Sequence, residues 1–182
     1  MKYAISVLVV SSLLLAPAVR AQAPAPAPAT GTLAADVLAD WQGQKEQMMG
    51  LAGAMPEDKF GYKSTPAQRS YGEQILHVAQ INMFLLQSLG AKAAPPQVNL
   101  KATSKADILQ ALAQSYDFGT AALKEFNDAA MAQAVDGPRF LGRATRARIA
   151  YFAMSHAMDI YGQMAVYLRL NDIVPPASRR GV

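Results

Sequence analysis

The sequence predicts an all-α domain built as a four-helix bundle, and three observations point to it. Apolar residues recur at steps of three and four in four long segments, which is the spacing of one face of an α-helix. Stretches rich in proline and glycine separate these segments. No stretch of useful length alternates apolar and polar residues as a half-buried strand would, and no segment repeats another. Helices of this kind, joined in one chain, are expected to pack as a bundle.

The first two helices are predicted from their apolar faces and their ends. Thr32 is suited to cap a helix N-terminus, and the apolar pattern that follows it stops at Met55-Pro56. Thr65-Pro66 places a proline in the first turn of the second helix, where its missing N–H costs nothing. Gly90 is a typical residue to close that helix. We therefore expect one helix from Thr32 to the proline and a second from Thr65 to about Leu89.

Two more helices complete the predicted bundle. Ser104 is suited to cap the third helix, and the Asp136-Gly137-Pro138 turn breaks the chain after it. The last helix is predicted from about Phe140 to Leu170. The run from Val174 to Ser178 contains two consecutive prolines, which cannot extend a helix. This run is expected to cap the end of the bundle.

The N-terminal segment has the features of a signal peptide. Lys2 precedes an apolar run over residues 3–15, and small residues that suit a cleavage site follow it. Pro17 and Arg20 interrupt the run before it reaches the roughly 20 apolar residues that a membrane span needs. We interpret residues 1–21 as a signal peptide. The protein is therefore expected to be exported, either to the periplasm or to the medium, with no stable membrane span.

The rest of the chain is predicted to consist of a linker and a domain, which are residues 22–31 and residues 32–182. The first alternates alanine with proline, which favours an extended polyproline II linker. The second suits a single domain with one core, which no disulfide can stabilise because the chain contains no cysteine. Lysine and arginine number 17 against 13 acidic residues, but two of the basic residues belong to the predicted signal peptide. So small an excess, without interleaved aromatic residues, does not indicate a nucleic-acid partner.

Both histidines of the chain fall on predicted helices beside other polar residues. Glu73 and His77 are four residues apart and share a helix face. On the last helix, His156 is followed by Asp159 and Gln163 at offsets of three and seven, so these three also share a face. A neutral imidazole is an ordinary ligand for zinc, nickel, copper or iron. If the two helices are neighbours, the two histidines can meet inside the bundle.

The chain resembles the DinB-like family, also called damage-inducible DinB or YfiT-type, of four-helix bundles. The resemblance extends over nearly the whole predicted domain and is carried by four segments: Met55 to Phe60, Arg69 to His77, His156 to Gln163, and Tyr167 to Ser178. In this family, one histidine of the second helix and two of the last helix, four residues apart, hold a divalent metal. The resemblance makes His77 the first ligand and His156 the second. Ile160 stands where the third should be.

Isoleucine at position 160 leads to two hypotheses, because it cannot ligate a metal and it desolvates the place where the ion would sit. In the first, the site is degenerate, and the protein is a non-catalytic member that binds a ligand or a partner. His77 and His156 would then be core imidazoles that form hydrogen bonds with Glu73, Asp159 or Gln163.

In the second hypothesis, a carboxylate replaces the missing ligand. Asp159 or Glu73 would join His77 and His156 to hold zinc, nickel or iron. The resemblance implies the activity of a metal-dependent hydrolase or a thiol S-transferase, in which the metal generates the nucleophile. Tyr161 and Gln163 flank the site in the family pattern and are expected to line a pocket. We also expect a homodimer that forms through helix faces.

Overall fold

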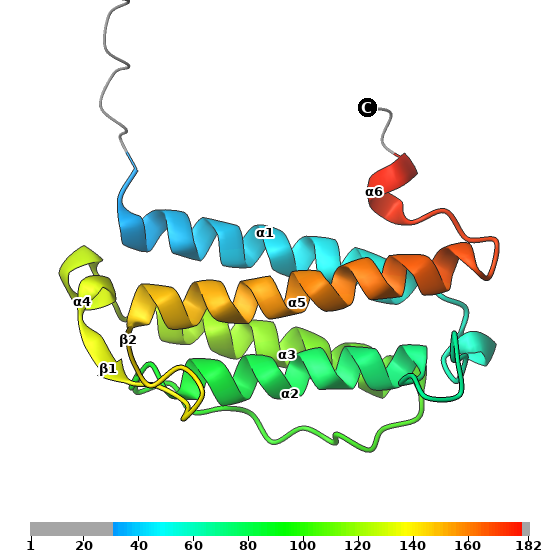
Figure 1. The fold of residues 1–182 in the computed structure, drawn as a ribbon, viewed down its shortest axis with the longest axis horizontal. Helices are drawn as coiled ribbons and strands as arrows, with labels where there is room; N and C mark the ends of the chain where they lie inside the picture. The colour runs from blue at the N-terminus through cyan, green and yellow to red at the C-terminus, as the bar shows by residue number, and fades with distance from the viewer. Residues whose placement is uncertain (1–30, 180–182) are drawn as a thin grey trace, which may run out of the picture.

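Four long helices lie side by side in the computed structural model, which describes residues 31–179 (Figure 1). They are α1 Leu33–Ala54, α2 Tyr71–Gln87, α3 Lys105–Leu123 and α5 Arg146–Arg169. α2 packs against α3 and α5, and α1 packs against the same two helices. The predicted all-α bundle is therefore confirmed. The predicted signal peptide, residues 1–21, and nearly all of the predicted linker, residues 22–30, lie outside the described residues.

The first and third helices begin where the sequence predicts. Thr32 accepts a hydrogen bond from the backbone N–H of Ala35 at 3.3 Å, and α1 ends just before Met55. At the start of α3, the hydroxyl oxygen of Ser104 accepts a hydrogen bond from the N–H of Asp107 at 3.1 Å. Each cap satisfies a backbone donor that the first helical turn leaves free, so these polar side chains mark the helix starts.

The predicted start of the second helix at Thr65-Pro66 is wrong. These residues form a turn in which the N–H of Gln68 donates to the carbonyl of Thr65 at 3.1 Å, and α2 begins only after Ser70. Ser70 and Glu73 make a capping box: the serine hydroxyl accepts from the Glu73 N–H at 3.2 Å, and the Glu73 carboxylate accepts from the Ser70 N–H at 2.6 Å. Because this box satisfies two backbone donors, it fixes the helix start more strongly than the proline does.

A short helix and a β-hairpin lie between α3 and α5, where the last helix was predicted to begin at Phe140. That helix begins instead at Arg146. The intervening elements are α4 Asp128–Ala132, β1 Ala134–Asp136 and its antiparallel partner β2 Arg143–Thr145. Strands of three residues are too short to show an alternating pattern. Gly142 has a φ of +61°, a left-handed conformation that favours glycine and lets the hairpin turn back.

Two shorter elements stand at the other end of the bundle. They are the 3₁₀ helix η1 Glu57–Lys59 and the one-turn helix α6 Pro176–Arg179. α6 lies beside the end of α1, and the guanidinium of Arg169 donates to the hydroxyl of Ser178 at 3.3 Å. Pro176 stands at the first position of α6, where its missing N–H costs nothing. None of the helices in the described part of the chain combines the length and apolar character that crossing a membrane requires.

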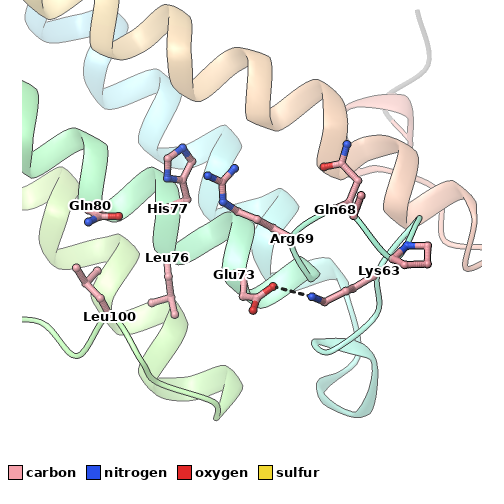
Figure 2. Close-up of a pocket in the computed structure, with 10 residues that line it drawn as sticks. Lys63, Gln68, Arg69, Glu73, Leu76, His77, Gln80 and Leu100 are labelled. Atoms are coloured by element: carbon pink, nitrogen blue, oxygen red, sulfur yellow. Dashed lines mark ion pairs between the residues drawn. The ribbon is translucent and has the colours of Figure 1, made fainter.

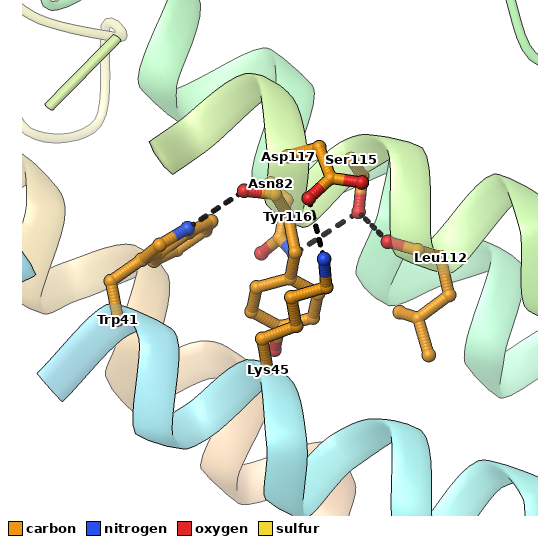
Figure 3. Close-up of polar contacts among 7 residues, drawn as sticks. All are labelled: Trp41, Lys45, Asn82, Leu112, Ser115, Tyr116 and Asp117. Carbon is orange, nitrogen blue, oxygen red and sulfur yellow. Dashed lines mark hydrogen bonds and ion pairs between the residues drawn. The ribbon is translucent and has the colours of Figure 1, made fainter. Parts of the chain in front are cut away.

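The side chain of Trp41 is fully buried and points from α1 toward α3 (Figure 3). Its indole N–H donates to the carbonyl of Tyr116 at 2.9 Å, and the two rings pack with their centroids 4.8 Å apart. Gly119 faces the indole so closely that a Cβ atom at this position would overlap the ring. In the same layer, the buried amide of Asn82 donates to the hydroxyl of Ser115 at 3.4 Å. A polar layer inside the core thus links α1 and α2 to α3.

Candidate functional site

The two histidines meet between α2 and α5. Their ring centroids are 5.1 Å apart, and the rings stand at 69° to each other. Both side chains are half-buried. The Nδ1 atom of His156 is fully buried and has no hydrogen-bond partner in the described part of the chain. A buried ring nitrogen without a partner is unusual and marks a candidate site.

Ile160 follows His156 by one helical turn and belongs to the hydrophobic core. Its side chain is 3% exposed and packs with the other buried residues of the bundle. It therefore brings no polar atom to the histidine pair. At position 160 the space is occupied by an apolar side chain that packs in the core.

The two carboxylates considered as substitute ligands are engaged elsewhere. Glu73 closes the capping box of α2 and forms an ion pair with Lys63, with its Oε2 atom 3.5 Å from the ammonium. The hydrogen bond from the Ser70 N–H, followed by the charge of Lys63, holds the pKa of Glu73 below its usual value. The carboxylate of Asp159 accepts a hydrogen bond from the side-chain amide of Gln163 at 3.0 Å.

Gln163 links α5 to α2 by a hydrogen bond. Among the described residues, it makes no hydrogen bond to His77 or His156. Its side-chain oxygen accepts from the amide of the fully buried Gln74 at 3.0 Å, while its own amide donates to Asp159. The Nδ1 atom of His156 therefore has none of the partners, Glu73, Asp159 or Gln163, that the first hypothesis offers for the imidazoles. The sequence pattern placed the polar groups on the correct helix faces. The pairing of Gln163 with Gln74 depends on side-chain reach across the helix interface.

Arg69 is a residue of the site that the sequence pattern does not single out. The segment before α2 brings its side chain to the rim of an open pocket next to His77 (Figure 2). The backbone of Arg69 is fixed, because the hydroxyl of Tyr167 donates to its carbonyl oxygen at 2.8 Å. Tyr62 packs edge-on against the ring of Tyr167, with centroids 6.0 Å apart, and holds the other end of the same segment. Nothing in the local sequence indicates this contact, since Arg69 and Tyr167 are far apart in the chain.

The pocket beside His77 has a volume of about 440 Å³. Lys63, Gln68 and Arg69 line one end, and Leu76 and Leu100 line the other together with Gln80 (Figure 2). A second hollow of about 420 Å³ continues from these leucines along Phe60 and Ile108. Each hollow falls within the range of about 300–1,000 Å³ that is typical of small-molecule sites.

Tyr161 and Gln163, which were expected to line the pocket, are not among the residues that line either hollow. Tyr161 is half-buried and packs against the core, and Gln163 is held by Gln74. His156 lies behind His77 and does not reach the pocket wall. The part of the site that a ligand can touch is therefore formed by α2, the segment before it, and Leu100 of the connection between α2 and α3.

Both imidazoles have a pKa below the ordinary histidine value. Burial lowers the pKa of His77 most, and the positive charges of Arg69 and His156 lower it further. Burial also lowers the pKa of His156; the carboxylate of Asp159 opposes this effect and Arg69 adds to it. Near pH 7 both rings are therefore mainly neutral.

The free energy of unfolding is expected to fall as the pH is lowered below about 6.5, the ordinary pKa of histidine. The unfolded chain binds protons at that pKa, whereas the folded chain resists protonation of His77 and His156. The free energy of unfolding is therefore highest above this pH and decreases as the pH falls below it. Urea unfolding between pH 5 and pH 8 measures the effect. The chain has two histidines, so the His77→Gln/His156→Gln variant should lose this dependence; an unchanged dependence in the variant would contradict the assignment.

A family model described as the DinB superfamily matches residues 40–164 of the chain. The chain belongs to the DinB superfamily. Among solved structures, it is similar to a DinB-like protein from Bacillus cereus ATCC 10987, with a TM-score of 0.67 and 18% sequence identity. The match covers 77% of this chain and 93% of that chain, and at this identity it shows the fold alone. No curated protein matches the sequence.

The residues of this DinB-superfamily site do not fit the three-histidine metal site that the resemblance implies. Two imidazole nitrogens, each about 2 Å from an ion, are compatible with rings 5.1 Å apart. A third protein ligand does not join them, because Ile160 is apolar and the nearby carboxylates are engaged. Within residues 31–179, no group of three histidine, cysteine, aspartate or glutamate side chains is placed to hold a metal ion. The positive charge of Arg69 also acts on both rings and would repel a cation.

Proposed function

We propose that this DinB-superfamily protein is a non-catalytic binding protein that takes a small ligand in the pocket beside His77 and holds no resident metal. The observation that carries the proposal is the burial of Ile160, whose side chain is only 3% exposed at the position of the third ligand. A side chain packed in the core cannot turn away to admit another donor without leaving a cavity. The pocket beside the histidines remains open and polar at one end.

The roles of Glu73 and Asp159 support this proposal over a metal-dependent hydrolase or thiol S-transferase. Moving the Glu73 carboxylate to a metal would remove half of the capping box of α2 and the ion pair with Lys63. The hydroxyl of Ser70 would still cap the helix, but the Ser70 N–H would lose its acceptor. Moving Asp159 would break its hydrogen bond to Gln163, which in turn bridges to Gln74. In either case, the free energy of metal binding would have to offset the loss of these contacts.

Export and self-association belong to the same proposal. Residues 1–21 are proposed to act as a signal peptide, which places the mature protein in the periplasm or the medium. A homodimer is proposed through the outer face of α5, where Tyr151, Met158 and Val166 lie at helical spacing and are 42%, 41% and 50% exposed. Exposed apolar side chains that share a helix face are a common feature of contacts between protein chains.

Native mass spectrometry of untagged protein, purified from its own compartment, tests these statements together. The expected result is a dimer of chains that begin after residue 21 and carry no stoichiometric metal. The control is the same protein treated with a chelator and then with zinc, which measures whether the site can be loaded at all. Stoichiometric zinc, nickel or iron in the untreated protein would overturn the proposal in favour of a metalloenzyme that uses His77, His156 and a carboxylate.

A further inference from the structure

We infer that the ligand is a small amphiphilic carboxylate, whose acid group lies between Arg69 and His77 and whose apolar body lies along Leu76 and Leu100. This inference rests on the proposed function, because it concerns the same pocket and names the class of ligand. It depends on the two unlike ends of the pocket and on the fixed position of Arg69 between the solvent and the histidines.

Arg69 provides the positive charge for the acid group. Within residues 31–179, its guanidinium takes part in none of the ion pairs, whereas the nearby ammonium of Lys63 is paired with Glu73. The planar guanidinium can donate two parallel hydrogen bonds to a carboxylate. In Figure 2 the guanidinium stands beside the imidazole of His77, and its charge acts on that ring. An anion placed between the two would remove this repulsion.

His77 supplies the second contact to the acid group. Its ring lines the pocket wall and carries at least one N–H in either protonation state. His156 packs behind this ring at a centroid separation of 5.1 Å and limits its movement. A carboxylate at this position would therefore receive hydrogen bonds from the guanidinium of Arg69 and the imidazole of His77.

Glu73 is the acidic group that borders the pocket, and its charge is largely compensated. Its carboxylate accepts a hydrogen bond from the Ser70 N–H at 2.6 Å and faces the ammonium of Lys63 at 3.5 Å. The same contacts hold the pKa of Glu73 below its usual value. Because the charge of Glu73 is offset by Lys63, this carboxylate repels an anion only weakly. The net charge at the Arg69 end of the pocket therefore remains positive.

The apolar end of the pocket suits a hydrocarbon chain. Leu76 and Leu100 line both hollows and join them, and the second hollow continues to Phe60 and Ile108. Leu100 is 38% exposed, so its side chain offers free apolar surface. Each methylene group that a ligand buries against such a surface strengthens binding by about fourfold. The ligand should therefore bind more tightly than its acid group alone.

Isothermal titration calorimetry with octanoate, acetate and octanol tests the inference on the full mature protein. Octanoate should bind more tightly than either acetate, which lacks the chain, or octanol, which lacks the charge. Replacing Arg69 with glutamine should weaken octanoate binding by about tenfold or more, because a hydrogen bond to a charged group is lost. The matched control is Arg139→Gln, an exposed arginine in the loop between β1 and β2, which should leave the affinity unchanged.

The Leu100→Ser variant tests the apolar end, and it should weaken binding of octanoate without affecting acetate. In NMR spectra, octanoate should shift the imidazole signals of His77. Equal binding of octanol, or equal loss in the Arg69→Gln and Arg139→Gln variants, would overturn the inference. Metal-free protein that binds no octanoate would also overturn it and leave the proposed function standing. If octanoate binds only after zinc is added, the proposed function fails instead.

Discussion

Replacing Gly119 with alanine should lower the free energy of unfolding by about 2–3 kcal/mol, which is typical of forcing extra volume into a packed core. A Cβ atom at this position would overlap the indole of Trp41 and the side chain of Leu86. The indole cannot move aside cheaply, because it is fully buried and its N–H donates to the carbonyl of Tyr116 at 2.9 Å. Since α1 and α3 meet here, the overlap must be relieved by moving whole helices apart.

Thermal and urea unfolding measure this effect against Gly43→Ala. For a domain of this size, the expected loss for Gly119→Ala corresponds to a decrease in Tm of about 5–10 °C. Gly43 lies in α1, where a methyl group would meet no atom of another element within 4 Å. Alanine there should raise stability by up to about 1 kcal/mol through its better helix propensity. If both variants change stability in the same direction, the packing of Gly119 against Trp41 is not as described.

Replacing Ile160 with histidine should convert the histidine pair into a stoichiometric zinc site. The new imidazole would lie one turn after His156 on the helix that faces His77, and three histidines with one open position are a common zinc environment. In the metal-free state, the variant should be less stable by about 1–3 kcal/mol, because a polar ring replaces a side chain of the core. Zinc should restore this loss, since binding to the folded state alone stabilises it.

The matched control for this variant is Ile160→Asn, which also buries a polar group but adds no imidazole. Metal content by mass spectrometry and Tm with and without zinc compare the two. The control should be destabilised and should not gain stability with zinc. An Ile160→His protein that stays empty at saturating zinc would mean that His77 and His156 do not converge on one point. Adding Arg69→Gln to Ile160→His should increase zinc affinity further, because a positive charge beside both imidazoles is removed.

The sequence predicts the parts of this molecule that depend on local periodicity. The apolar faces of α1 and α3 and their caps Thr32 and Ser104 were identified because each signal lies within one helical turn. The start of α2 was wrong because Pro66 also fits a turn, and only the interlocking of Ser70 with Glu73 distinguishes the two cases. The hairpin before α5 was missed because its strands hold three residues each.

The candidate site was predictable only in part for the same reason. His77 and His156 could be placed on facing helices, since both lie in regular structure. The contacts of Glu73 with Lys63 and of Gln163 with Gln74 could not be predicted, because each depends on which side chain reaches it from another element. The pair Asp159–Gln163 lies within one helix at a four-residue spacing. Arg69 lies in an irregular segment whose path is set by tertiary contacts. Such a residue carries no periodic signal that would indicate its place beside the histidines.

The hydrogen bond from Tyr167 to the carbonyl of Arg69 has a consequence for the cost of ligand capture. The backbone of Arg69 is held on one side by this bond and continues on the other into Ser70, the cap of α2. The main chain at Arg69 is therefore ordered before a ligand binds, and binding restricts only the rotamers of the Arg69 side chain. Immobilising such a side chain costs about 0.5–1.5 kcal/mol, whereas ordering a flexible segment costs about 1–2 kcal/mol for every residue fixed. Preorganisation of this kind lets even a ligand of few atoms bind without a loop having to close over it.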